Sequence, residues 1–320
     1  MSANAIRRTV VVLSCLAACG LMPLDAAAQT PQRVNGTTVT MTPPAGFAPA
    51  KDFAGFADEK TKSSILIAEL PPEAWPQLSA LFGNLDTVRA GFKQKAIDVA
   101  TLDKVPTASG DAFLASGTQT AAGTKLAKWV ALAQGSRTVM ITVQAMPAAK
   151  LDDAAIKAML KTVSLGAPPS ESDKLASLPF KVAPSEPFRV LDTMGGTGVA
   201  MTVGEKNVDP KGEQPLLIVS SQVSGGPVAG IDPAVVAKTL LKQTREMESA
   251  EIDTEKKVSF GGSSDGVLLE GKAGENKRFV QYFATGPKGH FVRLVSFFAA
   301  DRNTELRPAI EKVAGSVAFK

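Results

Sequence analysis

The most constraining feature of this sequence is a long segment that occurs twice. The segment Asp111 to Leu165 recurs 154 positions later as Asp265 to Phe319, and the two copies align without a gap. Both share one pattern, in which three apolar strands separated by turns precede an amphipathic helix. Reappearance at a fixed spacing is the signature of repeated units, so the sequence predicts two copies of one module. The identical pairs are Asp111 and Asp265, Leu114 and Leu268, Gly117 and Gly271, Gly135 and Gly289, Ala145 and Ala299, Ala155 and Ala309, Ile156 and Ile310, and Val163 and Val317.

The length of 320 residues agrees with two modules, because each half is long enough to bury a core of its own. Mostly antiparallel strands with one helix midway and one at the end predict an α+β fold, in which each module is a sheet packed against helices. We expect the first module at residues 29–167 and the second at 183–320. A linker rich in Pro and Ser, residues 168–182, separates them.

The N-terminus has the features of an export signal. Arg7 and Arg8 precede an apolar stretch, and Ala26, Ala27 and Ala28 offer a cleavage site of small residues, so we expect residues 1–28 to be removed. A second interpretation is open, because the residues before Cys19 resemble a bacterial lipobox, in which the cysteine is lipidated. The first interpretation predicts a periplasmic or secreted protein. The second predicts a lipoprotein anchored in the membrane and facing the periplasm.

Helix starts are predicted from capping residues. Asp86 is expected to cap a helix that runs to Ile97, and Asp152 a helix that buries Ile156, Met159, Leu160 and Val163. Asp232 followed by Pro233 is a strong start signal, because proline lacks only an N–H that would be unpaired there. The last helix is expected at 304–317, with Pro308 favouring a start near Arg307. Strands are expected near 34–42, 53–57, 64–70, 111–120, 125–133, 137–144, 188–191, 198–203, 216–221 and 291–298, and around Val267, Phe279 and Tyr282.

The first module begins with a strand that ends in Pro44-Ala45-Gly46-Phe47. A strand pair, a mid-domain helix, three further strands with Gly turns and a last helix follow. This order resembles the PsbP/DcrB-like family, in two tandem copies. The resemblance implies non-enzymatic accessory or binding roles, and no functional residue carries over from it. The second module lacks the Pro-x-Gly-aromatic motif.

The sequence offers few groups for catalysis or for binding a metal or cofactor. Both cysteines, Cys15 and Cys19, lie in the expected signal, so the rest of the chain has no disulfide and no thiolate site. The single histidine, His290, follows a turn glycine and is expected to be an exposed turn residue. We therefore expect no catalytic residues, no cofactor and no metal site.

Two glycine clusters are expected to be structural. The stretch from Gly266 to Ala273 approaches a phosphate-binding loop, but Ala273 supplies no hydroxyl and the intervening residues favour a strand. Gly195, Gly196 and Gly198 fit a hairpin turn, since no strand and helix flank them as a dinucleotide site requires.

Acidic residues are also expected to be structural. Asp152 and Asp153 fit a helix start. Glu246, Glu248, Glu251, Asp253 and Glu255 could gather a calcium ion, but they lack the spacing of a calcium loop, so a solvated face is expected.

Charge gives no sign of a nucleic-acid partner. Without its leader, which holds two Arg and one Asp, the chain has 33 basic and 30 acidic residues, spread evenly. The leading hypothesis is an exported, non-catalytic protein that binds another envelope component or a small ligand. One alternative is a structural or assembly subunit, or a chaperone, of a membrane-associated complex. A remote alternative is a hydrolase that uses carboxylates alone, which needs two facing Asp or Glu residues in one pocket.

Overall fold

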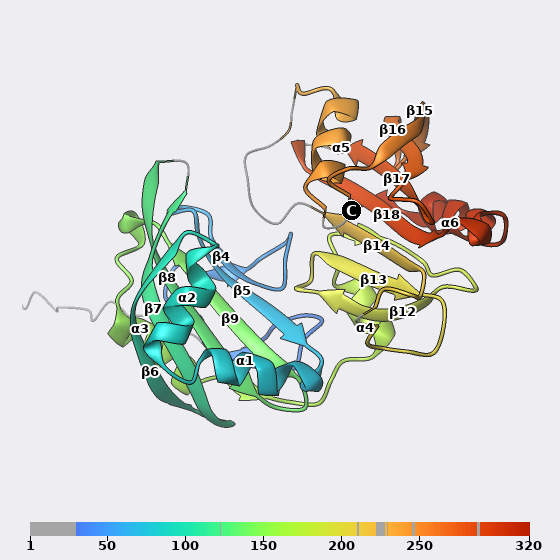
Figure 1. Cartoon of the computed structure of the whole chain (residues 1–320). Helices are drawn as coiled ribbons and strands as arrows, with labels where there is room; N and C mark the ends of the chain where they lie inside the picture. Colours follow the sequence, from blue (N-terminus) through green and yellow to red (C-terminus); the bar gives the residue numbers. More distant parts are fainter. Residues whose placement is uncertain are drawn as a thin grey trace, which may run out of the picture.

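The computed structural model describes residues 30–121, 123–209, 211–221, 228, 230–244, 247–286 and 289–320, so the expected signal and Cys19 lie outside the described residues. Two seven-stranded antiparallel sheets, each with helices packed against it, form two modules (Figure 1). The expected α+β class is therefore confirmed. None of the described helices is both long and apolar enough to cross a membrane.

The first sheet has the strand order β3-β4-β5-β9-β8-β7-β6. Helices α1 and α2 lie over one face and α3 over the other (Figure 1). The strands are β3 Ala48–Pro49, β4 Gly55–Asp58, β5 Ser63–Leu70, β6 Ile97–Thr107, β7 Gly110–Ala121, β8 Thr124–Gln134 and β9 Thr138–Ala145. The helices are η1 Pro72–Ala74, α1 Trp75–Leu81, α2 Leu85–Lys93, η2 Pro147–Ala149 and α3 Asp153–Lys161. A small sheet joins β1 Gln32–Arg33, β2 Val39–Met41 and β10 Ser164–Leu165.

The second sheet has the order β12-β13-β14-β18-β17-β16-β15, with α5 on one face and α6 on the other. Its strands are β12 Arg189–Met194, β13 Gly198–Thr202, β14 Leu216–Ser221, β15 Glu251–Phe260, β16 Ser263–Lys272, β17 Lys277–Thr285 and β18 Phe291–Ala299. Its helices are α5 Pro233–Lys242, η4 Ala300–Arg302 and α6 Asn303–Ser316. The expected linker contains α4 Glu171–Ala176 and β11 Phe180–Lys181, and β11 pairs with β19 Ala318–Phe319.

The two sheets correspond strand by strand, and one shared irregularity explains a shared glycine. The register shifts between Val99 and Thr101 on β6, and between Ile252 and Thr254 on β15. Opposite these bulges lie Gly117 and Gly271. A Cβ atom on either glycine would collide with the backbone carbonyl of the bulged strand, at Asp98 or at Glu251. Each bulge therefore requires a glycine on the neighbouring strand.

The prediction of a repeat without gaps is wrong, because the turns differ in length. Eight residues separate the paired Thr118 and Ala127, whereas five separate the corresponding Lys272 and Arg278. The spacing between copies therefore falls from 154 on β7 and β16 to 151 on β8 and β17. The next turn has three residues in the first sheet and five in the second, which gives a spacing of 153 on β9 and β18. Gly135 with Gly289 and Ala145 with Ala299 are thus not equivalent pairs.

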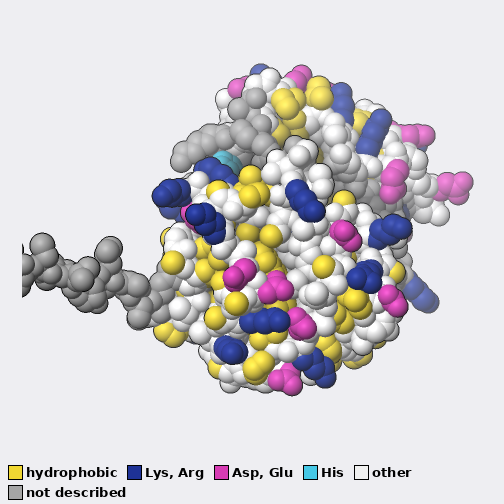
Figure 2. Space-filling model, turned by 90° about the vertical axis from the view of Figure 1, so that its left-hand side faces the viewer, with side chains coloured by type: hydrophobic (Ala, Val, Ile, Leu, Met, Phe, Trp, Pro, Cys, Tyr) yellow, Lys and Arg dark blue, Asp and Glu magenta, His cyan; other side chains and the backbone are white. Residues whose placement is uncertain are grey.

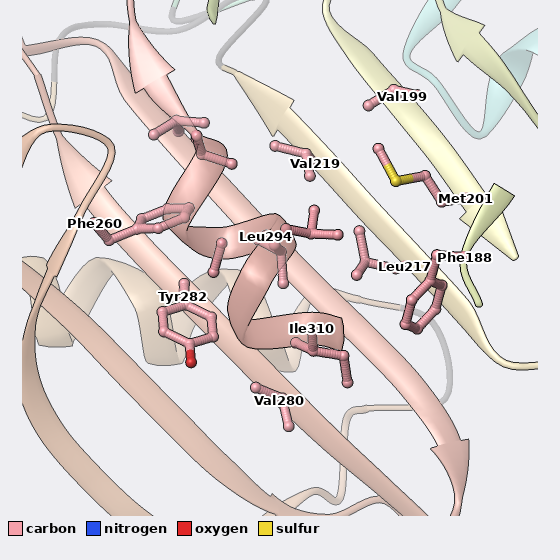
Figure 3. Close-up of a cluster of buried hydrophobic side chains, with 14 of the residues drawn as sticks. Phe188, Val199, Met201, Leu217, Val219, Phe260, Val280, Tyr282, Leu294 and Ile310 are labelled. Atoms are coloured by element: carbon pink, nitrogen blue, oxygen red, sulfur yellow. The ribbon is translucent and has the colours of Figure 1, made fainter. Parts of the chain in front are cut away.

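Each sheet buries apolar side chains on both faces. In the first module, α3 packs Ile156, Met159 and Leu160 on one face, as expected, around the buried Trp129. In the second module, α6 packs Ile310 against Val280 and Leu294 on the corresponding face (Figure 3). These equivalent clusters hold the helix that ends each module against its sheet.

One predicted helix cap is wrong, and so is the suggested start of the last helix near Arg307, whereas its expected start near Thr304 is confirmed within one residue. Asn84, rather than Asp86, caps α2, since its side chain accepts a hydrogen bond from the Thr87 amide at 3.0 Å. That helix ends at Lys93, and Ile97 already belongs to β6. The last helix starts at Asn303 rather than near Arg307, so Pro308 lies inside it. The caps at Asp152 and Asp232 are confirmed.

The long edge strands β6 and β15 were not expected from the sequence. Charged residues occupy both faces of β15, and most of its side chains are exposed. Charged side chains are typical of protected sheet edges, and they hide the apolar alternation that normally indicates a strand.

The modules meet through a cluster of partly buried charges. Arg137, in the turn before β9, forms an ion pair with Asp192 on β12 and lies 4.0 Å from Glu69 on β5. Lys174 on α4 binds the same Asp192 at 2.9 Å. The Ala54 amide also donates a hydrogen bond to the Gly195 carbonyl at 3.2 Å. The junction therefore involves both modules and the segment that links them.

Candidate binding site

A hollow of the second module lies at the N-terminal end of α5. It has a volume of about 820 Å³ and opens to solvent between α5 and the strands β15, β16 and β17. Pockets of roughly 300–1,000 Å³ are typical of ligand sites. Its lining consists of Val228, Gly230, Ile231, Asp232, Pro233, Ala234, Glu255, Lys256, Lys257, Ser263, Asp265, Val267 and Thr285. We call this space the α5 hollow.

The capping sequence of α5 fixes one wall of the hollow. The Asp232 side chain accepts a hydrogen bond from the Ala234 amide at 2.8 Å, and Pro233 occupies the first turn. The helix buries Ala237 and Leu241 against the sheet. Ile231 lies beside the hollow and is 50% exposed, whereas the sheet residue Val267 is 6% exposed. Seven of the thirteen lining residues are charged or polar, and Val267 and Ile231 add apolar groups at the base and at the rim.

The charged residues around the hollow are engaged with one another. Lys257 forms an ion pair with Asp265 at 2.9 Å, and this hydrogen bond raises the pKa of the lysine. Glu255 pairs with Lys238 on α5 at 2.7 Å. Because the third carboxylate, Asp232, caps the helix, each acid lining the hollow already has a partner. This arrangement gives no support to the carboxylate-only hydrolase hypothesis, which needs an acid and a base facing a substrate.

The corresponding place in the first module is filled with aromatic side chains. The strand registers make Phe113 the equivalent of Val267, since Lys104 pairs with Phe113 and Lys257 with Val267. The Phe113 ring lies 6.2 Å from the ring of Trp75 and 6.1 Å from that of Phe82. Phe82 is only 1% exposed. The same scaffold position is therefore packed in one module and hollow in the other.

Two further sequence differences distinguish the two modules near this position. Leu102, which packs in the first module, corresponds to the exposed Glu255. The segment before α2 carries Trp75 and Phe82, whereas residues 222–232, which precede α5, contain no aromatic residue. On this face the second module carries its aromatic groups on the sheet, where the buried Phe283 lies opposite Val267 and its ring lies 5.2 Å from that of Phe291.

A polar network fixes α5 to the sheet. Arg293 Nε donates to Gln281 Oε1 at 2.7 Å, and its Nη2 donates to Thr244 Oγ1 at 2.9 Å. The buried Gln281 then donates from Nε2 to the Ala237 carbonyl at 2.9 Å. Burial lowers the pKa of Arg293 to about 10, because the charged form loses hydration. The network holds one wall of the hollow in place.

The single histidine is not part of this site. His290 is exposed, as expected, and lies in the turn before β18. By the strand registers, His290 is equivalent in position to Arg137 of the first module, rather than to Ser136 as the gapless alignment implied. It does not line the hollow.

Both glycine clusters have the expected structural roles. The segment from Gly266 to Lys272 lies within β16, and Ala273 follows directly. Gly195 and Gly196 form the turn between β12 and β13, and both have positive φ angles. Neither cluster forms a phosphate-binding loop.

The acidic run is distributed along β15. Asp253 pairs with Arg278 at 3.0 Å, Glu255 pairs with Lys238, and Glu246 lies outside the described residues. Within the described ranges, no group of three or more acidic, His or Cys residues could hold a metal ion. On the face shown in Figure 2, basic and acidic side chains are mixed with apolar ones, and no charge of one sign predominates.

No family model matches the chain, and no curated protein matches it in sequence. Among solved structures, it is similar to LpqN, a protein involved in cell envelope biogenesis of Mycobacterium tuberculosis. The identity is 17% over 44% of this chain and 83% of LpqN, with a TM-score of 0.32. PsbP (CyanoP) from Synechocystis sp. PCC 6803 is 14% identical over 44% of this chain and 82% of its own length, with a TM-score of 0.29.

The immunity protein TplEi of the Pseudomonas aeruginosa T6SS, in complex with the "L" peptide, is similar over 92% of this chain and 99% of its own. The identity is 10% and the TM-score is 0.29. Scores at this level carry no argument about the function of this chain. Functional inference therefore depends on the chain's own residues.

Proposed function

We propose that this chain is an exported, non-catalytic protein that binds another component of the cell envelope through its second module. The observation that carries the proposal is the α5 hollow. It is open where the same scaffold position of the first module is closed by Trp75, Phe82 and Phe113. A difference of this kind between two similar units marks the position where one of them has a task beyond folding.

The chemistry of the hollow supports binding rather than turnover. Its carboxylates pair with lysines or with a backbone amide, and no acid and base face one another across it as proton transfer to a substrate would need. Its apolar base and the exposed Ile231 provide the kind of surface that partners bury. The protein therefore acts by contact.

Export follows from the leader sequence. Arg7, Arg8 and the small residues ending at Ala28 direct the chain out of the cytoplasm, with the first module at 29–167, the linker at 168–182 and the second module at 183–320. The common strand order of the two sheets supports descent from one duplicated PsbP/DcrB-like module. Lipidation at Cys19 is the alternative to cleavage after Ala28, and intact mass spectrometry of the mature protein distinguishes them.

A site-specific photo-cross-linker at Ile231 tests the proposed function in cells that export the chain. We expect a discrete adduct with one envelope component. The control carries the cross-linker at Lys312, an exposed position on α6, on the opposite face of the sheet. Absence of an adduct at Ile231, or the same adduct at both positions, would refute the proposal.

A further inference from the structure

We infer that the α5 hollow is a socket for an aromatic side chain supplied by a protein partner. This inference rests on the proposed function and specifies the chemistry of the contact. The first module provides the template, because its own Trp75 and Phe82 reach the position that corresponds to Val267. In the first module the chain's own rings pack at this position, and in the second module a ring of the partner packs there instead.

The floor of the socket fits a ring. Val267, a smaller residue at the position of Phe113, lies at the base of the hollow, whose volume of about 820 Å³ has room for a flat side chain from outside. Aromatic side chains bury large areas and carry much of the energy of protein interfaces. The rim residue Ile231, half exposed, can close over an inserted ring.

The charges at the socket also suit an aromatic occupant. In the first module, Lys104 Nζ lies 5.5 Å from the centre of the Phe113 ring. Its equivalent by register is Lys257, which lines the hollow. A cation near the face of an aromatic ring is favourable, so the same strand position can contact the ring of a partner. Lys257 pairs with Asp265 at 2.9 Å beside the space that the ring would enter.

The occupant is a side chain on a peptide segment rather than a free small molecule. The hollow opens to solvent along α5, and in the first module the corresponding rings are carried by α1 and by Phe82 directly after it. A peptide can place apolar residues on Ile231 and Val235, which are 50% and 55% exposed, while one ring enters the hollow. A free aromatic compound would leave these two side chains in water.

Amide chemical-shift titrations of the full mature chain test the socket. The probes are N-acetyl-tryptophanamide, N-acetyl-alaninamide and a peptide with the sequence of residues 72–84 of this chain, which carries both template rings. We expect saturable shifts at Val267, Ile231 and Thr285 with the tryptophan probe. The alanine probe should bind at least about tenfold more weakly, a difference of about 1.4 kcal/mol. The peptide should bind at least about tenfold more tightly than the tryptophan amide.

Two matched variants decide the location. Val267→Trp fills the socket from within and should abolish the shifts, whereas Val208→Trp places the same indole at an exposed position outside the hollow and should leave them unchanged. Equal binding of the tryptophan and alanine probes, or unchanged binding to Val267→Trp, would overturn the socket. If the tryptophan amide bound as tightly as the peptide, the assignment to a protein partner would be overturned. Retained cross-linking at Ile231 would show that the proposed function had survived either failure.

Discussion

Replacing Phe113 by valine, the residue at the equivalent position of the second module, should destabilise the first module. Truncating a buried Phe to Ala costs about 3–5 kcal/mol, and valine retains part of that contact. Phe113 is only partly buried, but it also loses ring contacts with Trp75 and Phe82, worth about 0.5–1.5 kcal/mol each. We expect a loss of about 2 kcal/mol in the free energy of unfolding.

The chain contains a convenient reporter for this measurement. Its two tryptophans, Trp75 and Trp129, both lie in the first module, so tryptophan fluorescence follows the unfolding of that module. With a urea m-value of about 2 kcal/mol/M, the midpoint should fall by about 1 M. The matched variant Val267→Phe adds a ring to an open space in the second module and should leave this transition unchanged. An unchanged midpoint in Phe113→Val, or an equal shift in Val267→Phe, would refute the equivalence of the two positions.

Three other predictions concern the second module. Gly271→Ala should lower the free energy of unfolding by about 1–3 kcal/mol, because its Cβ collides with the Glu251 carbonyl. The control Gly315→Ala, in α6, places a Cβ where no atom lies within 4 Å and should not destabilise the protein. Equal urea midpoints for the two variants would contradict this prediction. Arg293→Met should destabilise the module by about 1–3 kcal/mol, because it leaves the buried Gln281 oxygen unpaired. Adding Gln281→Val gives the second module the residues of the equivalent positions of the first, Met140 and Val130. The double variant should recover most of the lost stability, as measured by thermal unfolding. Burial raises the pKa of Tyr282 to about 12, whereas the phenol of the unfolded chain ionises near 10. The free energy of unfolding should therefore fall as the pH rises from about 10 towards 12. Titration of the phenolate absorbance of this single tyrosine should show no midpoint near 10.

The parts of the fold that depend on local signals could be predicted from the sequence. Asp152 and the Asp232-Pro233 pair start α3 and α5, because capping is a property of a few adjacent residues. The alternation of Val139, Ile141 and Val143 predicted β9, since one face of that strand is buried. In each case, a single element contained the whole signal.

Features that depend on pairing between elements could not be predicted in this way. The gapless alignment failed because the lengths of turns leave no trace in an apolar pattern, and this error paired His290 with Ser136 instead of Arg137. Strands β6 and β15 were not predicted, because charged residues at a sheet edge interrupt the alternation of apolar and polar residues that indicates a strand. The junction between Arg137 and Asp192 joins residues 55 positions apart and has no local sequence signal.

The α5 hollow was not predicted from the sequence either. The gapless alignment already pairs Phe113 with Val267, because the spacing is 154 on these strands, but it does not show that Trp75 and Phe82 pack against Phe113. A signal was nevertheless present, because residues 222–232 carry no aromatic residue whereas the segment before α2 carries two. That contrast becomes informative only once the contacts of Trp75 and Phe82 with Phe113 are known.

The proposed socket of the second module holds a position for a ring that the first module supplies to itself. Intermolecular nuclear Overhauser effects between the Val267 methyl groups and the ring protons of the peptide of residues 72–84 test it most directly. We expect contacts from Val267 and Ile231 to the tryptophan ring. Contacts that involve only residues outside the hollow, or no contacts at saturation, would contradict it.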